Sequence, residues 1–254
     1  MVDFSNIQTK KAVEPPRLVM YGPPKIGKTG LAASIPGNVI FDIEGGSGYH
    51  NAARVEKSDL SSFDAFMGAL GDLYTQDHPF TSLTIDTVDW LEVLVFEQAA
   101  REHGKQSIAD VGYGAGYATA QGIWKQVLCA LDDLRIKKNM MIILLAHECV
   151  VRYDNPLTES YDRFTIKLRN NDKGSSSASI IKEWSDGLFF INKETFVVKK
   201  KEGLKEVSKG KTSEQVYFHT QESPAFLAGN RFGLPAQIPF NWPALEAELN
   251  KVLF

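Results

Sequence analysis

The chain has few cysteines, no long apolar run and no strong excess of either charge. Cys129 and Cys149 are too few for a disulfide framework, so both are expected to be free thiols in a reducing cytoplasm. The longest apolar run, residues 140–146, is too short to span a bilayer, and the first residues show no signal-peptide pattern. These absences favour a soluble, cytoplasmic protein with no membrane partner over a secreted or membrane protein.

The charge balance also excludes a general attraction to polyanions. Lysine and arginine number 28 against 31 aspartates and glutamates, which gives a net charge of −3 and a pI near 6.0. Any nucleic-acid binding must therefore come from a local basic surface. With 254 residues, 43% of them apolar and 23% charged, the chain has ordinary globular composition and is near the upper limit for one compact domain.

One motif does stand out. Residues 22–29 fit the pattern G-x-x-x-x-G-K-[ST] at every required position, between a strand-like run and a helix-like run. Such a loop turns its backbone N–H groups toward one point, and the following helix adds the positive end of its dipole. Lys28 would reach the β- and γ-phosphates, and the Thr29 hydroxyl would bind Mg²⁺. The alternative is a Pro/Gly turn without a ligand. The predicted nucleotide contacts are Gly22, Pro23, Pro24, Lys25, Ile26, Gly27, Lys28, Thr29 and Gly30.

Apolar periodicity predicts an α/β fold with a mainly parallel central sheet, flanked by helices and carrying an antiparallel edge extension. The expected parallel strands are residues 17–21, 38–43, 82–86 and 140–146, and the expected helices between them begin near residues 30, 60, 90 and 123. Residues 104–122 are expected to be an irregular connection, and residues 152–182 a polar loop. The predicted antiparallel strands are residues 188–191, 195–200 and 215–220, before a terminal helix at 241–252. We expect a single domain, 1–254, with an N-terminal arm (1–16), a core (17–192) and a hairpin extension with the C-terminal helix (193–254).

Three polar residues follow these apolar runs and are candidates for the chemistry. Asp86 ends the third strand and is a predicted Mg²⁺ ligand; its alternative role is a helix N-cap. Glu44 follows the second strand and could orient the attacking water as a general base, or be merely an exposed turn residue. His147 ends the fourth strand, near the edge where open α/β sheets bind ligands, and could instead be a structural histidine.

These motifs in this order resemble the RecA-like recombinase ATPases, and in particular the phage family of P-loop proteins that includes the Sak-type single-strand annealing ATPases. The resemblance is carried by residues 21–29, 41–46, 85–87, 144–148 and 229–235. It implies a RecA-like P-loop fold that binds ATP and Mg²⁺ and hydrolyses ATP. It also implies that Glu44 is the catalytic glutamate and that His147 senses the γ-phosphate, where RecA itself has Gln. A phage-encoded protein would work in the cytoplasm of its host.

The resemblance further implies two loops that face single-stranded DNA at the axis of a ring or filament of identical subunits. Tyr113 and Tyr117 lie in the first, at about residues 104–120, where bases could stack on their rings. Lys167, Arg169 and Lys173 lie in the second, at about residues 152–182, and could contact phosphates. The alternative is that both are ordinary surface loops.

A neighbouring subunit would supply a positive charge to the γ-phosphate during hydrolysis. Lys200, within the lysine run 199–201, and Arg231 are the candidates for this trans-acting residue. A lysine run is also typical of a solvated face, and Arg231 could simply shape a turn.

The resulting hypothesis is an ATPase of phage recombination type that binds single-stranded DNA and promotes annealing or strand pairing. A single-strand-binding protein is a further candidate partner. The alternatives are a RecA-like motor or loader in phage replication, and a nucleotide-gated interaction module that does not bind DNA.

Overall fold

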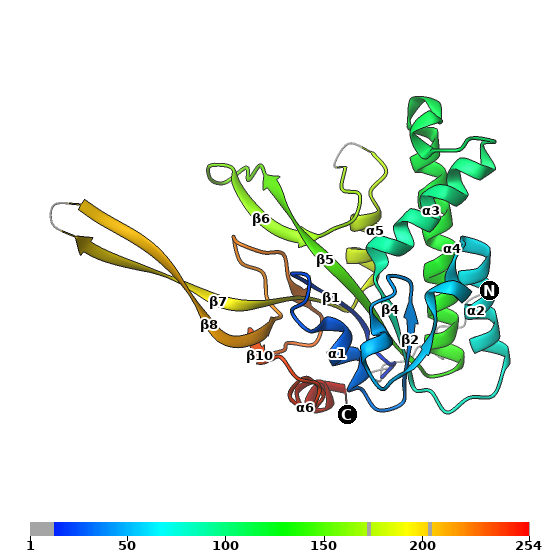
Figure 1. Cartoon of the computed structure of the whole chain (residues 1–254), viewed down its shortest axis with the longest axis horizontal. Helices are drawn as coiled ribbons and strands as arrows, with labels where there is room; N and C mark the ends of the chain where they lie inside the picture. Colours follow the sequence, from blue (N-terminus) through cyan, green and yellow to red (C-terminus); the bar gives the residue numbers. More distant parts are fainter. Residues whose placement is uncertain (1–12, 172–173, 203–204, 254) are drawn as a thin grey trace, which may run out of the picture.

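The structure is a computed structural model that describes residues 13–171, 174–202 and 205–253. For residues 194–213, which belong to β7, β8 and the segment between them, the side chains are not described. Its strands are β1 (Arg17–Gly22), β2 (Asn38–Asp42), β3 (Ala53–Val55), β4 (Ser82–Asp86), β5 (Met141–Tyr153), β6 (Tyr161–Ile166), β7 (Gly187–Glu202), β8 (Lys205–His219), β9 (Gly229–Asn230) and β10 (Gln237–Pro239). The α-helices are α1 (Lys28–Ala33), α2 (Phe63–Thr75), α3 (Val88–Glu102), α4 (Ala115–Lys137), α5 (Ser177–Trp184) and α6 (Trp242–Leu253) (Figure 1).

The strands form one twisted sheet in the order β10-β8-β7-β1-β5-β4-β2-β3. Neighbours from β7 to β3 run parallel, and β7, β8 and β10 pair antiparallel at the other side. The predicted architecture, a mainly parallel sheet with flanking helices and an antiparallel edge, is confirmed. Because β1, β2, β4 and β5 are parallel, their carboxyl ends meet at one edge of the sheet.

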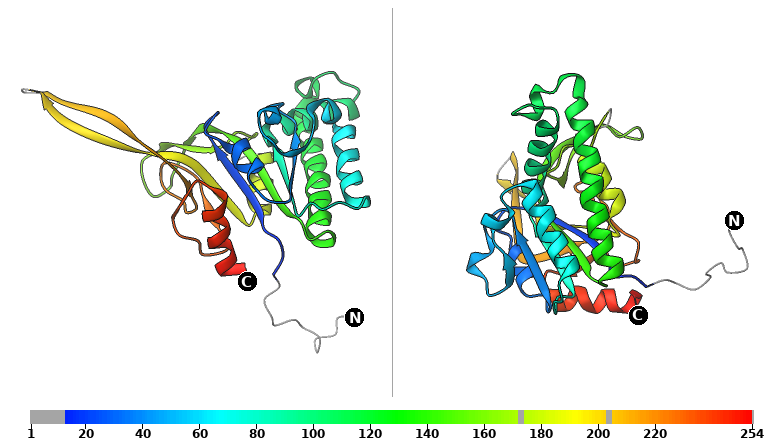
Figure 2. Two further views of the ribbon diagram at one scale, coloured as in Figure 1. Left: turned by 60° about the horizontal axis from the view of Figure 1, so that its bottom comes forward. Right: turned by 90° about the vertical axis from the view of Figure 1, so that its right-hand side faces the viewer.

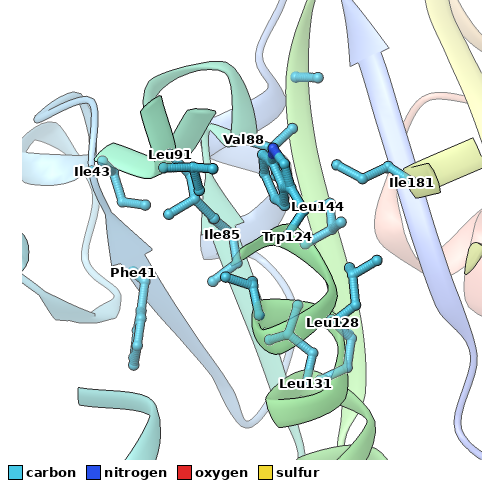
Figure 3. Packing of buried hydrophobic residues seen from close by; sticks show 14 of the residues in the cluster. Phe41, Ile43, Ile85, Val88, Leu91, Trp124, Leu128, Leu131, Leu144 and Ile181 are labelled. Carbon is cyan, nitrogen blue, oxygen red and sulfur yellow. The ribbon is translucent and has the colours of Figure 1, made fainter. Parts of the chain in front are cut away.

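Alternate residues of the central strands face two apolar cores, as expected for strands covered on both sides. Val19 and Tyr21 belong to the core beneath α2, α3, α4 and α5, whereas Leu18 and Met20 belong to the core beneath α1 and α6. Trp124 of α4 is 1% exposed and packs in the first of these cores (Figure 3). Because side chains alternate between the two faces of a strand, successive residues of β1 contribute to opposite cores, each covered by its own set of helices.

The antiparallel extension differs in shape from this layered body. Beyond their pairing with the central sheet, β7 and β8 continue as a two-stranded ribbon that projects from the molecule (Figure 2). Its strands pair as far as Glu202 and Lys205. None of the helices in the described ranges is long and apolar enough to cross a membrane.

Three local predictions were wrong. The helix α4 begins at Ala115 rather than near residue 123, and its glycine at Gly116 allows close packing, since a Cβ there would lie 2.8 Å from Ile108. The strand β5 does not end at residue 146 but continues to Tyr153, because its second half pairs antiparallel with β6. The expected loop at 152–182 contains β6 and the start of α5.

Candidate functional site

The loop between β1 and α1 has the backbone that its sequence predicts. Gly22 lies directly beside Ile191 of β7, and a Cβ at this position would collide with the carbonyl oxygen of Ile191. Gly27 has a φ of 108° at the N-cap of α1, a left-handed conformation that glycine adopts without a steric cost. The Leu31 N–H donates to the Gly27 carbonyl at 2.9 Å, so the helix begins immediately after this turn.

Lys28 is held under the loop. Its ammonium group donates to the carbonyl oxygens of Gly22 and Pro23, each at 2.9 Å, and the residue is 6% exposed. Burial lowers the pKa of Lys28, and the carboxylates of Asp86 and Glu44 oppose that shift. A lysine ammonium has three N–H donors, so the two carbonyls leave one donor for a ligand in the loop.

Asp86 and Thr29 form the second part of the site. The Thr29 hydroxyl donates to Asp86 Oδ2 at 2.6 Å, and Asp86 is 2% exposed at the end of β4. Burial raises the pKa of Asp86 to about 6, opposed by the Thr29 hydrogen bond and reinforced by the negative charges of Glu44 and Asp42. Asp86 is not the helix N-cap, because α3 begins at Val88 after Thr87.

This pair of oxygens fits Mg²⁺. The described residues contain no cluster of three or more His, Cys, Asp or Glu side chains suited to a metal. Mg²⁺, however, uses one or two protein oxygens together with waters and phosphate oxygens, and Thr29 and Asp86 offer such a pair. A cation there would also offset the unfavourable burial of the Asp86 carboxylate beside two other carboxylates.

Glu44 is positioned by a loop that Asp42 folds. The Asp42 carboxylate accepts hydrogen bonds from the backbone N–H groups of Gly45, Gly46 and Ser47, and from the Ser47 hydroxyl at 2.7 Å. The Glu44 N–H donates to the Asp86 carbonyl at 3.1 Å, which ties the loop to the end of β4. The Glu44 side chain is 35% exposed and lines the same cavity as Lys28, Thr29 and Asp86, so it is more than an exposed turn residue.

His147 faces the same pocket from β5. In the parallel register it is the partner of Gly22, at the last position that pairs with β1. Its backbone N–H and its ring Nδ1 contact the two carboxylate oxygens of Asp89 at 3.0 and 2.8 Å, and its Nε2 lies 3.8 Å from Glu44 Oε1. Burial raises the pKa of Asp89, but the bonds from His147 outweigh burial and leave this pKa below its ordinary value.

Two adjoining cavities meet at Glu44 and His147. The first, about 400 Å³, lies over the P-loop and is lined by Lys28, Thr29 and Asp86. The second, about 740 Å³, lies between the start of α3 and the strand β5. Sequence reasoning missed Asp42 and Asp89, and it also missed Tyr49 and His50, which line the first cavity. A polar residue one turn after a strand-end aspartate was the available signal for Asp89.

The candidate DNA contacts lie in a different arrangement from the one predicted. Tyr117 is on the first turn of α4, and the guanidinium of Arg169 stacks over its ring at 3.4 Å from the centroid. Tyr113 is fully exposed in the turn before α4, and Lys167 is exposed beside the second cavity. The two predicted segments thus contact each other. Lys173 lies outside the described residues.

The trans-acting candidates lie away from the pocket of their own chain. Lys200 is in β7, opposite Val207 of β8, and its side chain lies outside the described part. Arg231 is at the opposite edge of the sheet, where its guanidinium pairs with Asp186 at 3.2 Å and donates to the Glu183 carbonyl at 3.1 Å. Their roles toward a neighbouring subunit stay predictions.

Comparison with known proteins gives one family match and several similar solved structures. Residues 14–232 match the protein family described as AAA domain. A search of curated proteins found no match. Among solved structures the chain is similar to a KaiC-like protein from the hyperthermophilic archaeon Pyrococcus horikoshii OT3, with 11% identity and a TM-score of 0.41 over 90% of this chain and 86% of the other. It is also similar to the RadB recombinase, with 14% identity and a TM-score of 0.40 over 82% of this chain and 89% of the other. Because these scores are low, the fold assignment depends on the strand order.

Proposed function

The chain belongs to the AAA domain family, and from this premise we propose that it is a Mg²⁺-dependent ATPase of phage recombination type. P-loop domains of this family bind and hydrolyse nucleotides. We further propose that ATP drives assembly of this chain on single-stranded DNA and promotes annealing or strand pairing, as the resemblance to the Sak-type proteins implies.

The convergence of four residues on one cavity carries the ATPase proposal. Lys28, Thr29, Asp86 and Glu44 come from three separate elements of the chain, yet all line the same 400 Å³ space. ATP phosphates would lie along residues 22–30, with the third donor of Lys28 on the β- and γ-phosphates. Thr29 and Asp86 would hold Mg²⁺, which when bound neutralises the phosphate charge that develops in the transition state.

The reaction that these residues support is in-line hydrolysis. A water oxygen forms a bond to the γ-phosphorus while the bond from that phosphorus to the β,γ-bridging oxygen breaks, and ADP leaves with the bond's electron pair. Glu44 orients the water and accepts its proton, and inorganic phosphate is the second product. Glu44 is suited to this role because it is partly exposed at the boundary of the two cavities.

The proposed DNA surface is the patch formed by Tyr113, Tyr117, Lys167 and Arg169. It offers one freely exposed ring, one ring already stacked on a guanidinium, and an exposed lysine two residues before Arg169 in the chain. Lys167 connects the patch to the nucleotide site, since its backbone N–H donates to the His147 carbonyl at 2.8 Å. ATP would in this way alter DNA affinity, and a second copy would complete each ATP site within a ring or filament.

Two measurements test the proposal. The ATPase rate is measured with and without single-stranded DNA, and oligonucleotide binding is measured over a range of salt concentrations. We expect stimulation of hydrolysis and binding that weakens steeply with salt. Hydrolysis without DNA binding would favour a nucleotide-gated interaction module instead. DNA-stimulated unwinding without annealing would favour a motor or loader.

A further inference from the structure

Asp89 is a buried carboxylate that lies outside the four residues of the proposed ATPase site. It is the second residue of α3, and its side chain is 7% exposed. One carboxylate oxygen accepts the backbone N–H of His147 at 3.0 Å, and the other contacts Nδ1 of the same residue at 2.8 Å. A single side chain thus fixes both the backbone and the ring of His147.

This contact determines which ring nitrogen of His147 bears the proton. Ionised Asp89 can only accept hydrogen bonds, and its bonds from His147 keep its pKa below the ordinary value. A hydrogen must therefore lie on Nδ1, and in the neutral ring Nε2 is left with a lone pair. That lone pair belongs to the nitrogen that faces Glu44.

Nε2 and Glu44 Oε1 are 3.8 Å apart, too far for a direct hydrogen bond. Two acceptors at this separation can share one water molecule, which donates one hydrogen to each over distances of about 2.8 Å. The oxygen of such a water keeps its lone pairs directed away from both acceptors. The P-loop cavity adjoins this point, because Glu44 and His147 both line it.

We propose that Asp89 is a positioning residue for ATP hydrolysis: it holds His147 as the Nδ1–H tautomer, so that Nε2 and Glu44 together orient the attacking water. The proposal rests on the proposed ATPase function. Asp89 itself touches neither the water nor the nucleotide. It acts through His147, much as the buried aspartate of a catalytic triad orients its histidine.

The first test is Asp89→Asn in the full chain. The amide keeps the shape of the carboxylate, but its NH₂ group donates to Nδ1 and so favours the Nε2–H tautomer, which presents a donor to the water. We expect kcat to fall about 10- to 100-fold, the scale typical of residues that orient a reacting group, with the Kd for ATP unchanged within about twofold. A kcat within about twofold of the wild type would overturn the proposal.

Matched variants separate positioning from general damage to α3. Glu92 lies one turn further along the helix, is 8% exposed, and accepts the backbone N–H of Arg169 rather than contacting His147. Glu92→Gln should leave basal hydrolysis close to wild type. Because Asp89 acts through His147, adding Asp89→Asn to His147→Ala should cause no further loss. An additional tenfold loss would contradict this route.

A spectroscopic readout does not depend on activity. ¹⁵N NMR of histidine-labelled protein, assigned with the His147→Ala variant, shows which ring nitrogen bears hydrogen. We expect hydrogen on Nδ1 of His147 in the wild type and on Nε2 in Asp89→Asn. A wild-type ring with hydrogen on Nε2 at neutral pH would overturn the proposal. If the wild type hydrolyses no ATP, the proposed ATPase function is wrong. The NMR measurement would still show, independently, whether Asp89 sets the tautomer of His147.

Discussion

Lys28 and Asp86, at the carboxyl ends of the parallel strands (the carboxyl edge), differ from Asp186, at the amino ends of the same strands (the amino edge), in how well their charges are compensated. Asp42 and Asp89 at the carboxyl edge have enough hydrogen-bond donors, and their pKa values are lowered. At the carboxyl edge, burial lowers the pKa of Lys28 and raises that of Asp86 to about 6. At the amino edge, Asp186 pairs with Arg17, Arg135 and Arg231 at 2.9, 3.4 and 3.2 Å. Burial opposes ionisation of Asp186, but the hydrogen bonds and charges of the arginines outweigh it, so its pKa is lowered.

The difference separates a site built for function from one built for stability. Charges with enough partners stabilise the folded chain, whereas carboxylates gathered beside one lysine lower its stability and bind a cation and an anion well. The amino edge joins β1, the helix α4 and the segment before β7 through one carboxylate. At the carboxyl edge, the poorly compensated charges of Lys28 and Asp86 lower the stability of the chain without ligands, and bound Mg²⁺ and a triphosphate would neutralise these charges. Each prediction below tests one side of this contrast.

The largest effect is expected at the carboxyl edge, from Lys28→Ala. The variant loses the cation that reaches the β- and γ-phosphates, so we expect the ATPase rate to fall by about 10³-fold and ATP binding to weaken. Phosphate release and nucleotide titration measure both effects. Lys125→Gln is the control, because Lys125 is an exposed lysine on α4 that lines neither cavity. Normal ATP hydrolysis by Lys28→Ala would show that the ATP site is not at the carboxyl edge.

Asp186→Asn should produce the largest loss of stability. It removes the charge that three arginines share, and we expect the free energy of unfolding at pH 7 to fall by about 2 kcal/mol. Since the folded pKa of Asp186 lies below its unfolded value, the wild-type advantage is present above the unfolded pKa and disappears as pH falls through the folded one. Urea unfolding at pH 7 and pH 3 measures the gap.

Asp133→Asn is the matched control for that variant. Asp133 pairs with Lys137 on the exposed surface of α4, so its loss should leave the unfolding free energy unchanged. A similar loss in both variants, or a gap for Asp186→Asn that persists at pH 3, would contradict the assignment of the amino edge to stability.

Asp86→Asn should change stability in the opposite direction. The folded pKa of Asp86, about 6, lies above its ordinary value of 3.8, so the folded wild type gains stability as pH falls between these values and has lost it above pH 6. The neutral amide avoids this penalty. In EDTA at pH 7.5 we expect the variant to be more stable by about 1–2 kcal/mol, with the gap closing toward pH 4, although its Mg²⁺-dependent hydrolysis is lost. A less stable variant at pH 7.5 would contradict the contrast between the edges.

The parts of the site that were predictable are those fixed by local motifs and by parallel strands. The pattern at residues 22–29 dictates a loop with little conformational choice, and strand-end residues such as Glu44 and Asp86 must meet if the strands are parallel. Asp89 was not predictable in the same way. Its role depends on which strand lies beside the start of α3, and that is a matter of tertiary register rather than of spacing along the chain.

Loops and helix starts were the weaker part of the prediction for a related reason. Glycines at 114, 116 and 122 suggested an irregular segment, yet tight packing against Ile108 and Val111 makes Gly116 favourable inside α4. Likewise, β5 continues past His147 because β6 returns to pair with it, a contact between residues far apart in sequence. Composition alone does not show that Tyr117 and Arg169 contact each other, because this depends on both of these elements.

The smallest effect is expected from Arg169→Gln, at the proposed DNA surface. Its guanidinium already contacts the Tyr117 ring and donates to the Ser175 carbonyl at 3.2 Å, so part of its bonding capacity is used within the chain. We expect affinity for a single-stranded oligonucleotide to fall about three- to tenfold, and the slope of log K against log salt to decrease by about 0.7. Fluorescence anisotropy measures both.

Arg152→Gln is the control, since Arg152 is 63% exposed and forms a long, 3.8 Å ion pair with Asp162 across the β5–β6 hairpin. If both variants lose affinity equally, the binding is a general effect of charge. If neither variant loses affinity, the stacked Tyr117–Arg169 pair has a structural role, like the Asp186 cluster at the amino edge. The functional charges of the described residues would then lie only at the carboxyl edge.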